Sequence, residues 1–90
     1  MREFEWDIHN VGHVARHGIT PDEVEQTFEH PYVEIPVEPI RGEPRWKLFG
    51  MTDAGRHVTV VFAIRGSRTR PVTAYTTHRS DRRKYGAKTE

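Results

Sequence analysis

The sequence contains no cysteine, no long apolar run and almost no net charge, and each of these absences excludes a class of protein. Without cysteine, the 90-residue chain can form no disulfide framework, no thiolate metal site and no cysteine nucleophile. The longest apolar stretch, from Val58 to Ile64, includes Thr59 and is far shorter than the roughly 20 residues of a membrane-spanning helix. The first residues contain no apolar signal segment. The sequence therefore predicts a cytoplasmic protein that does not enter the membrane.

Apolar residues are also scarce, at 34% of the chain, while charged residues reach 30%. A chain of this length buries only about 60–65% of its unfolded surface, so its core is expected to be small. The composition is nevertheless that of a folded protein, because the net charge is only +1. We expect one domain that spans residues 1–90.

Charge is distributed unevenly along the chain. Residues 1–40 contain two arginines and nine acidic side chains, which sum to −7. Residues 41–90 contain twelve Lys and Arg side chains against four acidic ones, which sum to +8. Most of these cations are arginines, whose planar guanidinium binds phosphate through two hydrogen bonds. The second half therefore predicts a surface for an anionic partner, with a solvated basic face that balances an acidic one as the alternative.

The periodicity of the sequence predicts an α+β fold with the element order β-α-α-β-β-β-β-α. Asp7 is expected to cap a helix that runs to about His17, and Thr20 to cap a second helix that ends at His30. The other elements are expected to be strands at 3–6, 32–37, 46–50, 57–65 and 70–77, a loop at 41–44, turns at 52–55 and 66–67, and a short basic helix at 80–85. Prolines in the second strand predict either an edge strand or a strand that turns into a loop. The two early helices would pack on one face of an antiparallel sheet.

Nine apolar side chains are expected in the core: Trp6, Phe28, Trp46, Leu48, Val58, Val60, Phe62, Ile64 and Val72. Trp46 has an alternative interpretation, because it lies between Arg45 and Lys47, and an aromatic ring among cations can stack on a nucleic-acid base. In a chain with so few apolar residues, burial of this tryptophan is the favoured interpretation.

Four motifs occur in an order and spacing that are typical of one toxin family. They are Phe4-Glu5-Trp6-Asp7, Arg16-His17-Gly18-Ile19, the segment Val24–Phe28 followed by Pro31, and the segment from Val72 to Tyr85 that contains Arg79, Asp81, Arg82 and Arg83. In these motifs the chain resembles the BrnT ribonuclease toxins of type II toxin–antitoxin systems, which have a RelE-like fold. The resemblance implies an endoribonuclease that inhibits translation and growth and needs no metal or other cofactor. It also implies an RNA substrate and a ribbon-helix-helix, BrnA-like antitoxin, with which the toxin forms a heterotetramer.

Metal-independent RNA cleavage needs a base for the 2′-hydroxyl, an acid for the leaving 5′-oxygen and cations around the phosphorane. The catalytic candidates are His17, His78, Arg79 and Tyr85. The candidates for RNA binding are Arg16, Arg65, Arg68, Arg70, Arg82 and Arg83. Structural alternatives exist for several of them. His17 could stabilise a helix C-terminus, Tyr85 could anchor the last helix to the core, and the arginines of that helix could form a solvated stripe.

The sequence also departs from the family pattern, and two further hypotheses follow. Tyr75 stands where the family usually has arginine, and His78 where it usually has threonine. The loss of that arginine favours a catalytically inactive fold that binds nucleic acid or antitoxin. His9, His13 and His17 are spaced four residues apart, so on a helix they would form one stripe. Two such histidines can bind zinc, and a small metal-binding protein is the third hypothesis.

Overall fold

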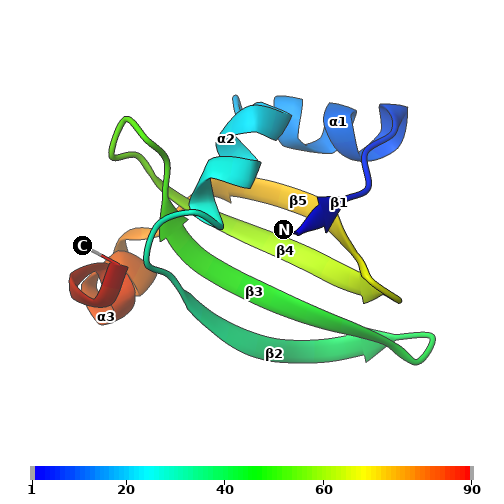
Figure 1. The fold of residues 1–90 in the computed structure, drawn as a ribbon. Coiled ribbons are helices and arrows are strands. Elements are labelled where there is room, and N and C mark those ends of the chain that lie inside the picture. The colour runs from blue at the N-terminus through cyan, green and yellow to red at the C-terminus, as the bar shows by residue number, and fades with distance from the viewer. Residues whose placement is uncertain (1, 90) are drawn as a thin grey trace.

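A computed structural model describes residues 2–89, and this part of the chain contains three helices and five strands (Figure 1). The strands are β1 (Glu3–Phe4), β2 (Val33–Ile40), β3 (Glu43–Met51), β4 (His57–Arg65) and β5 (Arg68–Thr76). The helices are α1 (Ile8–Ala15), α2 (Pro21–Thr27) and α3 (Arg79–Thr89). The predicted α+β class and the predicted order of elements are confirmed.

All five strands belong to one sheet with the spatial order β1-β5-β4-β3-β2. Strands β2 to β5 form an antiparallel meander, as the sequence predicts. Strand β1 instead pairs with β5 in parallel, so the sheet is mixed rather than wholly antiparallel. The sequence contained no information about the direction of β1, because side chains alternate with a period of two in both kinds of pairing.

The helix starts follow from local capping. The Asp7 carboxylate accepts hydrogen bonds from the backbone N–H groups of His9 and Asn10, and the Asn10 side chain accepts one from the Asp7 backbone. Thr20 and Glu23 form the same reciprocal arrangement at α2. The predicted end of the first helix at His17 is wrong, because α1 ends at Ala15 and the following turn holds Arg16 to Gly18.

Other predicted boundaries also change, and the second helix ends at Thr27 rather than at His30. The loop expected at 41–44 is a two-residue hairpin turn in which Arg41 has a φ of 52° and Gly42 a φ of 75°. Two successive positive φ angles match the twist of adjacent strands, so β2 and β3 continue up to the turn. Strand β2 passes through its two prolines because it lies at the sheet edge, where a missing N–H leaves no neighbour unpaired. The basic helix is longer than predicted and extends over Arg79–Thr89.

The core lies between the sheet and the pair α1 and α2, which cover one face (Figure 1). Its fully enclosed members are Val14, Ile19, Val24, Leu48, Val58, Val60, Phe62 and Ala74. Trp6, Phe28, Trp46 and Ile64 pack against this cluster, so eight of the nine predicted core residues are confirmed. Val72 is half-buried outside the cluster, because it occupies an irregularity in β5.

Trp46 belongs to the core and not to a base-stacking platform. Alternation along β3 turns its ring toward the helices and turns Arg45 and Lys47 toward the opposite face of the sheet. The stacking interpretation of Trp46 is therefore wrong, because that interpretation needs the ring and the two cations on one surface.

Helix α3 packs on the opposite face, at the end where β3 finishes. The ring of Tyr85 stacks on that of Phe49, with centroids 4.4 Å apart and planes inclined by 21°. Gly86 lies against buried His57, and α3 contacts both β3 and β2. The helix thereby closes one end of a sheet face that α1 and α2 leave uncovered.

Candidate functional site

The sheet face opposite α1 and α2, which we call the second face, carries three successive rows of side chains. Residues that pair across neighbouring strands point to the same side, and alternate residues along a strand share a face. From the α3 end, the rows are Tyr75–Thr59–Phe49, Thr73–Val61–Lys47 and Arg70–Ala63–Arg45. The second face thus combines an aromatic row beside α3 with two cationic rows farther away.

A bulge in β5 makes this arrangement possible. Thr73 pairs with Val61 but Pro71 pairs with Phe62, so Val72 is an extra residue in the strand. Thr73 and Arg70 are three positions apart, and regular alternation would place them on opposite faces. The bulge shifts the alternation by one residue and brings Arg70 to the second face, an effect seen beside many active sites.

Two of the predicted catalytic side chains meet at Tyr75. The His17 ring lies edge-on to the Tyr75 ring with centroids 6.1 Å apart, and the His78 ring stacks on Tyr75 with centroids 4.9 Å apart. His17 comes from the turn after α1, Tyr75 from β5, and His78 from the residues between β5 and α3. Both imidazoles are exposed, so a bound ligand can reach them. We call His17, Tyr75 and His78 the aromatic cluster.

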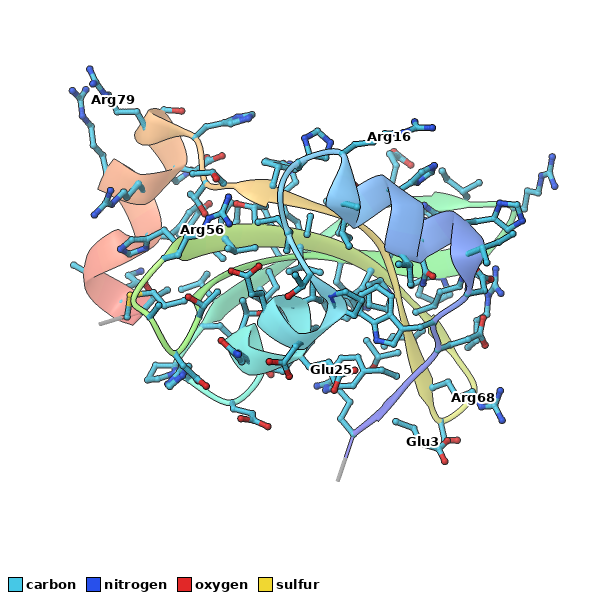
Figure 2. All side chains as sticks on the ribbon, turned by 90° about the horizontal axis from the view of Figure 1, so that it is seen from above. Glu3, Arg16, Glu25, Arg56, Arg68 and Arg79 are labelled. Atoms are coloured by element: carbon cyan, nitrogen blue, oxygen red, sulfur yellow. The ribbon has the colours of Figure 1, made fainter. Side chains whose placement is uncertain are left out.

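The sequence reasoning treated Tyr75 only as a departure from a family pattern and missed it as a site residue. The available signal was its spacing of three residues from His78, at the end of a strand that precedes a basic helix. Arg56 was also missed. Its guanidinium donates hydrogen bonds to the Gly18 carbonyl (3.0 Å) and to the Thr76 hydroxyl (2.9 Å). Arg56, which is labelled in Figure 2, joins the turn after α1 to the end of β5. It therefore holds the segment of His17 beside that of Tyr75.

The arginines of α3 lie next to this cluster. Arg79, Arg82 and Arg83 are exposed, and none of them forms an ion pair within residues 2–89. Figure 2 shows Arg79 and Arg16 projecting outward from the start of α3 and the end of α1. Tyr85 is different, because its ring packs on Phe49 under the helix. This contact favours the anchoring alternative for Tyr85, and its catalytic role stays a prediction.

The other predicted RNA-binding arginines are bound to carboxylates. Arg65 donates to Glu43 at 2.8 Å and to Glu5 at 3.0 Å, and Arg70 also donates to Glu5, at 3.1 Å. Arg68 lies 3.7 Å from Glu3, and both are labelled near the same end of the molecule in Figure 2. The acidic first half of the chain therefore neutralises part of the basic second half. RNA binding by these three arginines stays a prediction.

This network changes the ionisation of two of its members. The hydrogen bond from Arg70, together with backbone N–H groups of Asn10 and His9, lowers the pKa of Asp7 to about 2. The hydrogen bond to Glu43 raises the pKa of Arg65 above its ordinary value. Both shifts favour the charged forms, so the network persists across the neutral pH range.

Asp7→Asn is expected to remove a pH-dependent part of the stability. Asparagine still caps α1, so the variant differs mainly in the charge that Arg70 meets. Because the pKa of Asp7 is lower in the folded protein than its ordinary value of 3.8, its charge stabilises the fold above pH 3.8. That contribution is lost as the pH falls through about 2. Urea unfolding between pH 7 and pH 2 measures the free energy of unfolding of both proteins. The difference between the wild type and Asp7→Asn should shrink as the pH falls, and a difference that is constant across this range would contradict the assignment.

The three histidines of the predicted stripe do not converge on one point. His9 and His13 lie on α1, whereas His17 lies beyond the end of the helix and turns to Tyr75. Within residues 2–89, no group of three or more His, Asp or Glu side chains is placed to hold a metal ion. The hypothesis of a small metal-binding protein therefore has no support in the geometry.

Comparison with known protein families bears on the chain as a whole. Residues 6–81 match the family model for the ribonuclease toxin BrnT of type II toxin–antitoxin systems. The chain belongs to the BrnT family. The matched residues include the aromatic cluster and Arg79 and end before Arg82, Arg83 and Tyr85. No individual curated protein matches the chain closely enough to add to this assignment.

BrnT membership confirms the predicted family and places the chain among ribonuclease toxins. A type II toxin of this kind has RNA as its substrate class and a cognate antitoxin as its partner. No helix within residues 2–89 is both long and apolar enough to cross a bilayer.

Proposed function

We propose that the chain is a metal-independent endoribonuclease whose catalytic groups are the two imidazoles of the aromatic cluster. The observation that carries the proposal is the placement of His17 and His78 around Tyr75, on a surface flanked by Arg16 and Arg79. A domain formed by residues 1–90 would cleave RNA in the cytoplasm and thereby inhibit translation and growth. A ribbon-helix-helix, BrnA-like antitoxin would inhibit it within a heterotetramer.

The cluster can perform both proton transfers of RNA cleavage. One imidazole takes the proton of the 2′-hydroxyl while the 2′-oxygen attacks the phosphorus, and the bond to the 5′-oxygen breaks as the other imidazole protonates that oxygen. The products are a 2′,3′-cyclic phosphate and a 5′-hydroxyl. Imidazole suits either role, since it can bind or release a proton near neutral pH. Cations such as Arg79 would stabilise the charge that develops on the phosphorane oxygens.

Tyr75 would act as a positioning residue. Its stacking on His78 and its edge contact with His17 restrict both rings, which lie on segments outside regular secondary structure. Restricting catalytic groups before the substrate binds lowers the entropy that is lost at the transition state. A tyrosine in place of the usual family arginine can therefore serve the same site in a different way.

A catalytically inactive binding protein is the alternative that one observation favours. Arg65, Arg68 and Arg70 are paired with carboxylates, which reduces the positive charge offered to a transition state. Such a protein would still bind RNA or antitoxin through the exposed arginines of α3. A cleavage assay distinguishes the endoribonuclease from the inactive binding protein.

The test is incubation of purified protein with a mixed-sequence RNA in EDTA. We expect cleavage that leaves cyclic phosphate ends, that stops when the RNA is replaced by its 2′-deoxy counterpart, and that falls in His17→Ala and Arg79→Ala. Lys88→Ala, which removes one cation from the far end of α3, should cleave as the wild type does. A folded wild type that retains RNA without cleaving it would exclude the enzyme and establish the binding protein. Growth arrest on expression, relieved by the product of the adjacent gene, would test the antitoxin assignment.

A further inference from the structure

The third row of the second face borders a cavity of about 240 Å³ that the aromatic cluster does not use. The charged and titratable side chains around it are His9, His13, Arg45, Arg65, Arg70 and Glu43. Arg45 and Arg70 both pair with Ala63 in β4, so their side chains emerge on the same face on either side of a residue that has only a methyl group. Three guanidinium groups thus surround a space that contains one carboxylate.

Arg45 is the cation in this cavity that lacks hydrogen bonds. Its side chain is only 19% exposed, and its closest charged neighbour, Glu43, is 3.9 Å away. The Nε–H is buried without an acceptor, and no atom of residues 2–89 accepts a hydrogen bond from this guanidinium. Buried polar groups nearly always have partners, and an exception usually marks a site that a water molecule or an ion occupies. An anion in the cavity would supply the missing acceptors.

The neighbouring arginines support this role because their positions are fixed. Arg70 donates to Glu5 and lies 2.9 Å from Asp7, while Arg65 is held by Glu43 and Glu5. Neither Glu5 nor Asp7 lines the cavity, so these two carboxylates hold the arginines from outside it. Most of the charge of Arg65 and Arg70 is balanced in this way, and Arg45 is left as the main source of attraction.

The cavity lies on the same sheet face as the proposed active site. The row of Arg45 lies four residues along the strands from the row of Tyr75, which corresponds to about 13 Å. Lys47 occupies the row between them, and His13 lies beside Val72 at the adjoining edge of β5. A single RNA strand bound at the aromatic cluster can follow these rows toward the cavity and present a phosphate to Arg45.

We propose that this cavity is a phosphate-binding subsite for a backbone phosphate that flanks the scissile bond, with Arg45 as its principal donor. The proposal rests on the proposed function, since it takes the RNA strand to run from the aromatic cluster. An arginine fork binds two phosphate oxygens at once, which fixes the register of the strand as well as its affinity. The subsite would therefore determine which phosphodiester bond reaches the two imidazoles.

The test uses a 2′-O-methyl RNA hexamer, which binds but cannot be cleaved, and a set of hexamers in which one phosphate at a time is replaced by a neutral methylphosphonate. Arg45→Gln is expected to weaken binding of the unmodified hexamer by about 10- to 100-fold, the loss expected for charge-assisted hydrogen bonds. Neutralising one particular phosphate should weaken binding to the wild type by a similar factor and have little further effect on Arg45→Gln. Lys88→Gln should bind every hexamer as the wild type does.

The wild type alone provides a second readout, which does not depend on whether the variant folds. Inorganic phosphate should shift the ring proton NMR signals of His9 and His13 and leave those of His30 unchanged. Absence of these shifts, or equal binding by the wild type and a folded Arg45→Gln, would overturn the subsite. So would an acidic peptide that binds through Arg45 while no methylphosphonate affects the hexamer, because the cavity would then contact a protein. Since the hexamer is not cleaved, a failure of catalysis in the EDTA experiment stays distinct from a failure of this subsite.

Discussion

Replacing His78 with alanine is expected to slow RNA cleavage by about 10²- to 10⁴-fold, the usual contribution of a general acid or base. The expectation follows from the exposed imidazole of His78, which stacks on Tyr75 at the end of the aromatic row. His17→Ala should lose a similar factor. The double variant should lose less than the product of the two, because the groups act in one transition state. Single-turnover cleavage of a defined oligoribonucleotide measures all three rates.

The matched control for this series is His30→Ala. His30 pairs with Asp53 at 2.7 Å and makes no ring contact with Tyr75, so its loss should leave the cleavage rate unchanged. The pH dependence distinguishes catalysis from structure. The wild type should show a bell-shaped profile, and each single variant should lose one of its two limbs. A variant that is slower by the same factor at every pH would show that its histidine only maintains the fold.

Phe62→Ala should destabilise the protein by about 3–5 kcal/mol, as other buried phenylalanines do when truncated. Phe62 is 1% exposed and lies at the centre of the core. Its ring packs edge-on against Phe28 at 5.2 Å, and Phe28 in turn contacts Phe4 at 5.1 Å. Removing one ring therefore leaves a cavity and deprives a second ring of its neighbour. Since small domains have only about 5–15 kcal/mol of stability, the variant should be close to unfolding at physiological temperature.

Urea unfolding followed by tryptophan fluorescence measures this loss, and Val61→Ala is its control. Val61 directly precedes Phe62 in β4 but points to the second face and is half-buried. Its truncation should cost about 1 kcal/mol or less, because partly exposed side chains contribute less transfer free energy. Equal losses for the two variants would contradict the assignment of the core to the face that α1 and α2 cover.

The parts of the fold that sequence could predict are those set by neighbouring residues. Asp7 and Thr20 cap their helices through groups within three positions, so the start of each helix was readable directly. Alternation likewise assigned Leu48, Val60 and Phe62 to the core. The parallel pairing of β1 depends on contacts between Glu3 and Arg68, which are separated by most of the chain and leave no local pattern.

For the candidate site too, the sequence predicts residue types but not the contacts between distant segments. His17 and His78 could be proposed from residue type and motif, but their meeting at Tyr75 depends on how the turn after α1 folds against β5. The pairing of Arg65 and Arg70 with Glu5 was equally invisible, because it joins residues about sixty positions apart. The charge imbalance between the two halves predicts either a surface for an anionic partner or a basic face that balances an acidic one, and the ion pairs of Arg65 and Arg70 with Glu5 show that part of the imbalance serves the second purpose.

The extra residue in β5 has a consequence for how the family can vary in length. Deleting Val72 would rotate Arg70 to the helix-covered side and bring Pro71 out of its buried position. One inserted residue in the same stretch would also exchange the two faces for the side chains on one side of the insertion. Natural insertions and deletions should therefore collect in the hairpin at Arg41 and Gly42 and in other turns. The stretch from Arg70 to Tyr75 should instead keep one length wherever the strand still has to present both an arginine and an aromatic ring to the same ligand.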